Sequence, residues 1–64
     1  MKNFATVIQT EANKFDVFKF NAPTQKALYP QTSKVGVTVA VFESTEQNDK
    51  YCFELAEKMN ANGK

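Results

Sequence analysis

Residues 34–43, KVGVTVAVFE, alternate two kinds of side chain. Every second residue from Val35 to Val41 is a valine, and the residues between the valines are Gly, Thr and Ala before Phe42. A period of two is typical of a β-strand, whose successive side chains point to opposite faces of a sheet. We therefore expect a strand with its valine face in a deep core and its small-residue face against a second layer or solvent.

Two further runs rich in Phe, Val, Ile and Thr lie at residues 4–10 and 14–20. The polar tetrad EANK separates them, which predicts a β-hairpin. With Ala12 and Asn13 as a two-residue loop, Asn13 takes the left-handed turn position and Glu11 faces Lys14 across the ladder. A slip of the pairing by one residue would change which side chains share each face of the hairpin. In the register without a slip, one face carries Phe4, Ile8, Phe15 and Val17, and the other carries Ala5, Val7, Phe18 and Phe20.

The segment that follows, residues 21–34, contains two prolines. Thr24 is suited to cap a single helical turn, and Pro30 disfavours a helical conformation at the preceding Tyr29. We expect an irregular or one-turn helical connector that inserts Leu28 and Tyr29 into the core. A functional loop is the alternative.

A helix is predicted from Thr45 to about Asn60. Ser44 followed three residues later by Gln47 resembles a capping box, and acidic residues in the first turn suit the helix dipole. Because successive residues are about 100° apart around a helix, one arc forms an apolar stripe that packs against a sheet. This arc carries Asn48, Tyr51, Cys52, Leu55, Ala56 and Met59. Phe53 lies far outside it.

These elements predict a single α+β domain over residues 1–64, a small three-stranded antiparallel sheet with a short connector and one C-terminal helix packed on one face. A chain of 64 residues buries only about 60% of the surface that its unfolded form exposes. The single cysteine, Cys52, excludes an internal disulfide. The core must therefore come from apolar packing alone, or be helped by self-association.

The composition excludes most catalytic chemistry. The sequence has no His, no Arg and no Trp, and its eight positively charged side chains are all Lys. Proton transfer by imidazole, a Cys-His or Ser-His pair and bidentate guanidinium binding are therefore absent. Cys52 lies on the apolar stripe, which disfavours its thiolate, and Glu54 and Glu57 lie on the solvated face of the helix. We expect a protein that is not an enzyme and needs neither cofactor nor metal.

The sequence contains no membrane-spanning pattern. Polar residues interrupt the N-terminal MKNFATVIQT, and no run approaches the roughly 20 apolar residues that cross a bilayer. A lone cysteine is compatible with a reducing compartment. We expect a cytoplasmic protein that does not bind membranes.

Phe53 is the residue that most needs an explanation. It shares the outer side of the helix with Glu46, Asp49, Lys50 and Glu57. An aromatic side chain surrounded by carboxylates resembles an interface anchor. Alternatively, it is an ordinary exposed residue, or the connector folds over it. The hypothesis we carry forward is a protein-binding module, an inhibitor or regulator of the kind that phages and other mobile elements encode. Its site is Phe53 as the anchor, with a rim of Glu46, Asp49, Glu54 and Glu57.

Charge is unevenly distributed along the chain. Residues 1–42 carry five Lys and two acidic residues, a balance of +3, whereas residues 43–58 carry five acidic residues and two Lys, a balance of −3. A protein partner of the helix should therefore present a basic surface, or an apolar one with a basic rim. The same charges at i, i+4 spacing also support a plain solvated helix.

Two alternative functions remain. In the first, the hairpin binds single-stranded nucleic acid, with unpaired bases stacked on phenylalanine rings that are interleaved with lysines, although a net charge of +1 without Arg supplies little electrostatic drive. The residues for this site are Lys14, Phe15, Phe18 and Lys19. In the second, the chain is a structural subunit that forms a homodimer by pairing its sheet faces.

Overall fold

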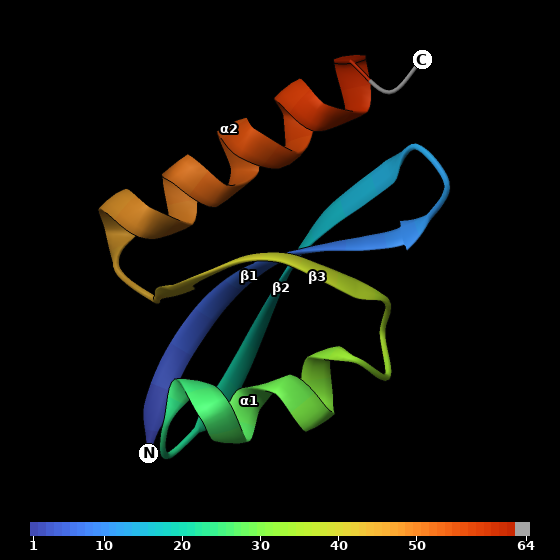
Figure 1. Ribbon diagram of the computed structural model, residues 1–64. Helices are drawn as coiled ribbons and strands as arrows, with labels where there is room; N and C mark the ends of the chain where they lie inside the picture. The colour runs from blue at the N-terminus through green and yellow to red at the C-terminus, as the bar shows by residue number, and fades with distance from the viewer. Residues whose placement is uncertain (63–64) are drawn as a thin grey trace.

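The computed structural model describes residues 1–62. The elements in chain order are β1 (Lys2–Glu11), β2 (Lys14–Ala22), α1 (Gln25–Thr32), β3 (Val37–Glu43) and α2 (Glu46–Asn62). The strands form one antiparallel sheet in the order β2-β1-β3. Helix α2 covers one face of the sheet and α1 lies against the other, so the sheet is the middle of three layers (Figure 1). The predicted α+β fold is confirmed, with β1 as the central strand.

The core lies on both faces of β1. Five consecutive residues, from Phe4 to Ile8, are buried. Because side chains alternate along a strand, they contribute to two clusters. Toward α2 lie Ala5, Val7, Cys52 and Ala56, with Phe15, Val17, Ala40, Phe42, Leu55 and Met59 packed around them. Toward α1 lie Phe4, Ala22 and Leu28, with Phe20 and Val41.

The hairpin turn forms as predicted, but the pairing register of the two strands beyond it differs from the prediction. Asn13 has a φ of 63° and Glu11 pairs with Lys14. Thr10 is then an extra residue in a β-bulge, so Gln9 pairs with Phe15. One additional residue moves every later side chain to the other face. The predicted faces are therefore wrong: Phe15 and Val17 lie with Ala5 and Val7, and Phe18 and Phe20 lie with Phe4 and Ile8.

The strand predicted at the alternating valines is confirmed as β3. The prediction that its valines lie in a deep core is wrong. A second irregularity, between the partners of Val7 and Ile8, leaves Val39 as an extra residue. Val41 packs toward α1, whereas Val37 is 65% exposed. The bulge breaks the alternation, and β3 is an edge strand that the helices cover only in part. The small-residue face is the better packed one, through Ala40 and Phe42.

The connector contains a helix of two turns. Thr24 is its N-cap, as predicted, since the Ala27 N–H donates to Thr24 Oγ1 at 3.2 Å. Leu28 is fully buried, but Tyr29 is exposed, because neighbouring helical residues point about 100° apart. Pro30 lies within the helix and does not end it at Tyr29, contrary to expectation. The carbonyl of Tyr29 still accepts the N–H of Ser33 at 2.9 Å.

Gly36 lies where the chain from α1 passes closely over β1. A Cβ atom at this position would overlap the carbonyl oxygen of Gln9 and press on Ile8. Backbone atoms of a central strand cannot move aside without disturbing its pairing. The residue that leads into β3 must therefore lack a side chain.

We predict that Gly36→Ala destabilises the fold by about 1–3 kcal/mol, because the added methyl group overpacks the contact with β1. Lys34→Ala, an exposed substitution in the same loop, is the matched control and should change the free energy of unfolding by less than about 0.5 kcal/mol. Urea denaturation followed by circular dichroism measures both. Equal stability of the two variants would contradict the close approach.

Candidate functional site

Helix α2 begins at a cap that the sequence pattern placed one residue too early. Thr45 Oγ1 accepts the N–H of Asn48 at 3.0 Å, so Thr45 caps the helix and the predicted capping box from Ser44 is wrong. The Ser44 hydroxyl instead donates to the Asp49 carboxylate, at 2.9 Å to Oδ1. Asn48 Nδ2 also donates to the carbonyl of Glu43 at 2.9 Å. These bonds fix the first turn of α2 against the end of β3.

Two polar contacts tie α2 to β2. Near the start of the helix, Lys19 Nζ lies 2.7 Å from Asp49 Oδ2. Near its end, the Asn60 side chain bonds both backbone groups of Phe15: Oδ1 accepts the N–H at 2.7 Å and Nδ2 donates to the carbonyl at 2.9 Å. A side-chain amide thus takes the place of a neighbouring strand at Phe15. Both contacts hold α2 over the β2 side of the sheet.

The inner face of α2 follows most of the predicted stripe. Cys52 and Ala56 are buried, and Leu55 and Met59 are half-buried. Desolvation, with a smaller contribution from the charge of Asp49, raises the pKa of the Cys52 thiol. The thiol therefore stays neutral and packs as a small apolar group.

Tyr51 departs from the stripe, since it is 50% exposed. Its ring meets that of Phe42 edge-on, with centroids 5.4 Å apart and an interplanar angle of 88°. It lies on the side of α2 toward β3, which the helix covers least because the ties at Asp49 and Asn60 run to β2, whereas the Asn48 bond to β3 is confined to the first turn. The amphipathic pattern alone does not reveal this sideways offset of the helix.

Phe53 points outward, as the sequence predicted, and is 59% exposed. The alternative in which the connector covers it is wrong, because α1 lies on the opposite face of the sheet (Figure 1). The ring stands beside a shallow groove between α2 and β2. This groove is lined by Phe15, Asp16, Val17, Phe53, Ala56, Glu57 and Asn60.

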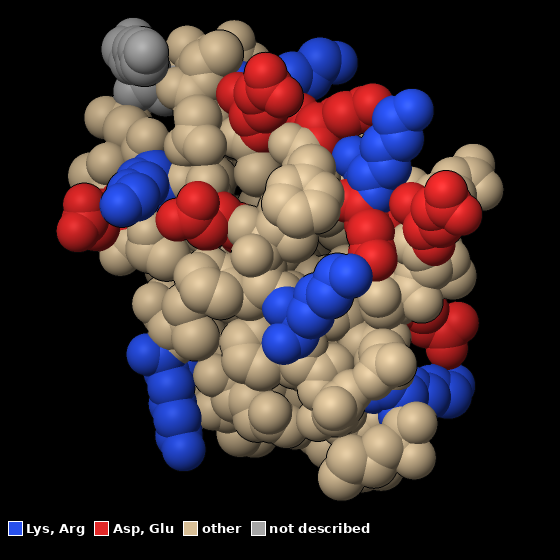
Figure 2. All heavy atoms as spheres, turned by 180° about the vertical axis from the view of Figure 1, so that it is seen from behind, with Lys and Arg blue, Asp and Glu red and all other residues tan. Residues whose placement is uncertain are grey.

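The four predicted rim carboxylates are in different environments. Glu46, Glu54 and Glu57 are exposed, and Glu57 borders the groove with Phe53. Asp49 is occupied by Lys19 and Ser44 and so acts as a structural tie. Figure 2, seen from behind, shows the acidic side chains mostly in the half of the molecule that α2 forms, with lysines among them. The predicted rim is therefore incomplete: Glu57 borders Phe53, whereas Asp49 is engaged internally and Glu54 lines a hollow with Tyr51 on the other flank of α2.

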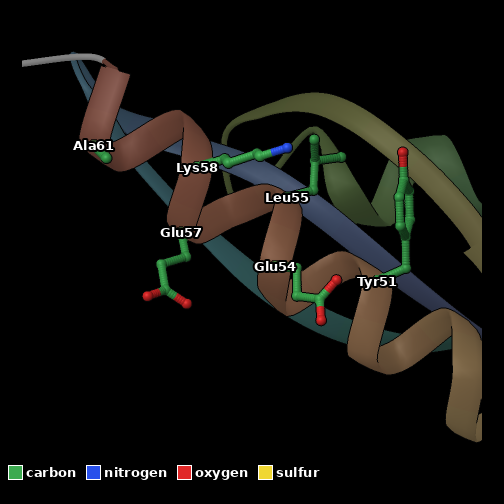
Figure 3. A pocket seen from close by; sticks show the side chains of 6 residues that line it. All are labelled: Tyr51, Glu54, Leu55, Glu57, Lys58 and Ala61. Atoms are coloured by element: carbon green, nitrogen blue, oxygen red, sulfur yellow. The ribbon is translucent and has the colours of Figure 1, made fainter.

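A second hollow lies along the other flank of α2. It is lined by Tyr51, Glu54, Leu55, Glu57, Lys58 and Ala61. Tyr51 and Leu55 point toward β3 in Figure 3, whereas Glu57 points to the opposite side of the helix. Sequence reasoning missed this hollow, although Tyr51 at the margin of the apolar stripe was a signal for it.

The residues predicted for nucleic acid binding do not form one surface. Lys14 is at the hairpin turn, and Lys19 is paired with Asp49. Phe15 packs toward α2, whereas Phe18 lies on the α1 face beside Phe20, with ring centroids 6.4 Å apart. Phe15 and Phe18 are three residues apart on one strand, so the alternation of side chains along β2 places the two rings on opposite faces whatever the register.

Within residues 1–62 no group of three or more potential metal-ligating side chains occurs, and no helix there has the length and apolar character needed to cross a membrane. Comparisons with protein-family models, curated proteins and solved structures find no match for this chain. The candidate site therefore has to be judged from its own geometry: an outward aromatic ring on a helix that is fixed near both ends.

The tie at Asp49 makes stability depend on pH. The hydrogen bond from Lys19 lowers the pKa of this carboxyl below its ordinary value of 3.8; partial burial opposes the shift, and the Ser44 bond adds to it. A pKa depressed by folding stabilises the protein above the unfolded value, and that contribution is lost as the pH falls through the folded value. We predict that the stability difference between wild type and Asp49→Asn shrinks as the pH falls below 3.8.

Urea titrations at several pH values test this prediction. Lys19→Gln is the matched control, because it removes the partner and keeps the carboxylate; the Asp49→Asn, Lys19→Gln double variant should lose little beyond either single one. A stability difference that stays constant from neutral to acidic pH would show that Asp49 contributes nothing through its charge.

Proposed function

We propose that this protein is a non-enzymatic protein-binding module that masks a partner's surface through the outer side of α2, with Phe53 as the anchor. The observation that carries the proposal is the 59% exposed ring of Phe53 on a helix held by Asp49 near one end and Asn60 near the other. A ring on a rigid support loses little conformational freedom on binding.

Burial of Phe53 would supply the binding energy. Covering a large apolar side chain contributes about 1.5–3 kcal/mol, and central aromatic anchors dominate many interfaces. The groove beside the ring already contains the half-buried side chains of Phe15 and Val17. An apolar side chain of a partner that enters this groove would contact all three residues.

Charge around the anchor favours a basic partner. The exposed carboxylates beside the Phe53 groove are Glu57 on α2 and Asp16 on β2, and Glu46 lies about two turns from Phe53 on the same side of the helix. Rim charges of one sign steer association and select among partners more than they add affinity. We infer a partner with an apolar patch bordered by Lys or Arg, and a role as an inhibitor or regulator in the cytoplasm, where an unpaired Cys52 stays reduced.

The test compares Phe53→Ala with Tyr29→Ala. Tyr29 is an exposed aromatic residue on α1, across the sheet from α2, and is therefore a matched control. A wild-type bait identifies the partner in lysate of the native cell, and calorimetric titration of the purified partner then measures affinity. We expect Phe53→Ala to weaken binding about 30-fold or more, equivalent to about 2 kcal/mol, and Tyr29→Ala to leave it unchanged.

Thermal unfolding of the same variants separates binding from folding. Phe53→Ala should change the free energy of unfolding by less than about 1 kcal/mol, because the ring is mostly in solvent. A large loss of stability, or equal affinity of wild type and Phe53→Ala, would refute the assignment of Phe53 as the anchor.

A further inference from the structure

The two edges of the sheet are closed to different degrees, and the β2 edge is closed at both of its ends. Asn60 bonds the outward N–H and carbonyl of Phe15, and Gln31 Nε2 donates to the carbonyl of Asn21 at 3.1 Å. Side chains from α2 and α1 thus occupy the two ends of this edge. β2 also carries charged side chains along its length, which hinder pairing with another strand.

The β3 edge is open at its centre. The Ser44 N–H donates to the carbonyl of Asn3 at 2.8 Å, so the backbone of Ser44 faces β1. Backbone direction alternates along an antiparallel strand, which turns the N–H and carbonyl of Glu43 and of Val41 away from the sheet. The Glu43 carbonyl is taken by Asn48, but among residues 1–62 the outward groups of Val41 have no partner.

The surface beside this open edge is apolar. Val37 is 65% and Val39 39% exposed, and neither helix crosses the outer side of β3 (Figure 1). Tyr51 and Leu55 of α2 point toward the same margin (Figure 3). From Val37 to Phe42 the strand contains no charged residue. We call the outward backbone of β3 together with Val37, Val39, Tyr51 and Leu55 the β3 margin.

We infer that the β3 margin is the surface through which two copies of this chain associate, with β3 antiparallel to its symmetry mate and the two sheets joined into one of six strands. An open antiparallel edge is complementary to itself about a two-fold axis. Unlike the pairing of sheet faces raised as an alternative from the sequence, this arrangement leaves both faces covered by helices.

The charges bordering the β3 margin favour a second copy over a partner of one charge sign. Lys34 precedes β3 and Glu43 ends it, so antiparallel pairing brings the lysine end of one copy toward the glutamate end of the other. Glu43 Oε1 already lies 3.2 Å from Lys2 Nζ in an exposed ion pair, so this end of the strand carries both charge signs. On α2, Glu54 and Lys58 line the adjacent hollow and also carry both signs. Around Phe53, in contrast, carboxylates predominate, and two copies would repel each other there.

Small size adds to the case. A domain of this length buries a smaller share of its surface than a larger domain does, and joining two copies removes more apolar surface from water. The inference does not rest on the proposed role of Phe53, because the β3 margin and the Phe53 groove lie on opposite flanks of α2.

Sedimentation equilibrium from about 1 μM to 1 mM, the range of weak to moderate complexes, tests the inference. We expect the wild-type mass to double with rising concentration, and Val39→Lys to weaken association at least tenfold by placing a charge on the paired edge. Phe53→Lys, which adds the same charge to the other flank of α2, is the matched control and should associate like wild type. If Val39→Lys does not fold, Val37→Lys at the more exposed position takes its place.

Amide exchange followed by NMR locates the contact. The Val41 N–H should exchange at least tenfold more slowly in the concentrated sample, whereas the N–H of Val17, which faces outward from β2 by the same alternation as Phe15, should not change. A chain that stays monomeric over the whole range would overturn the inference. The inference would also be overturned if Val39→Lys associated like wild type and Phe53→Lys did not associate. Loss of partner binding in Phe53→Ala with unchanged self-association would support the anchor and the dimer independently. The two proposals can therefore be refuted separately.

Discussion

The complete burial of the middle of β1 is the constraint on which the rest of the structure depends. The segment from Phe4 to Ile8 packs against a helix on each face and pairs with a strand at each edge. Its one polar side chain, Thr6, is satisfied by donating to the carbonyl of Phe18 at 2.9 Å. A chain of this length has only two segments left to cover two faces, so α1 must cross one face and α2 must cover the other.

The position of α2 over the sheet determines which surfaces remain open. The ion pair at Asp49 and the amide of Asn60 both tie the helix to β2. Phe53 and Tyr51 are two residues apart and therefore point to opposite sides of the helix. The first stands over the closed β2 side and the second over the open β3 side. The position of α2 thus produces two separate surfaces: a charged one around Phe53 and the apolar β3 margin.

Local patterns predicted the elements of this fold, and long-range geometry decided what the patterns could not. The left-handed Asn13, the Thr24 cap, the strand at β3 and the outward Phe53 each follow from a few neighbouring residues. The faces of the strands did not, because a bulge adds one residue without a local signature and reverses everything beyond it. Asp49 was assigned to the rim for a similar reason: its partner Lys19 lies far away in sequence and meets it only in the folded protein.

The two open surfaces are compatible with each other because of their placement. If β3 pairs with its symmetry mate, each α2 keeps its Phe53 flank turned away from the shared axis, since that flank faces β2 at the far edge of the sheet. A dimer would then present two identical anchors on one rigid body. Two linked sites bind a repeated or dimeric partner far more tightly than one, provided that the spacing fits. A chain with no Arg and no His would in this way gain affinity through geometry instead of through stronger individual contacts.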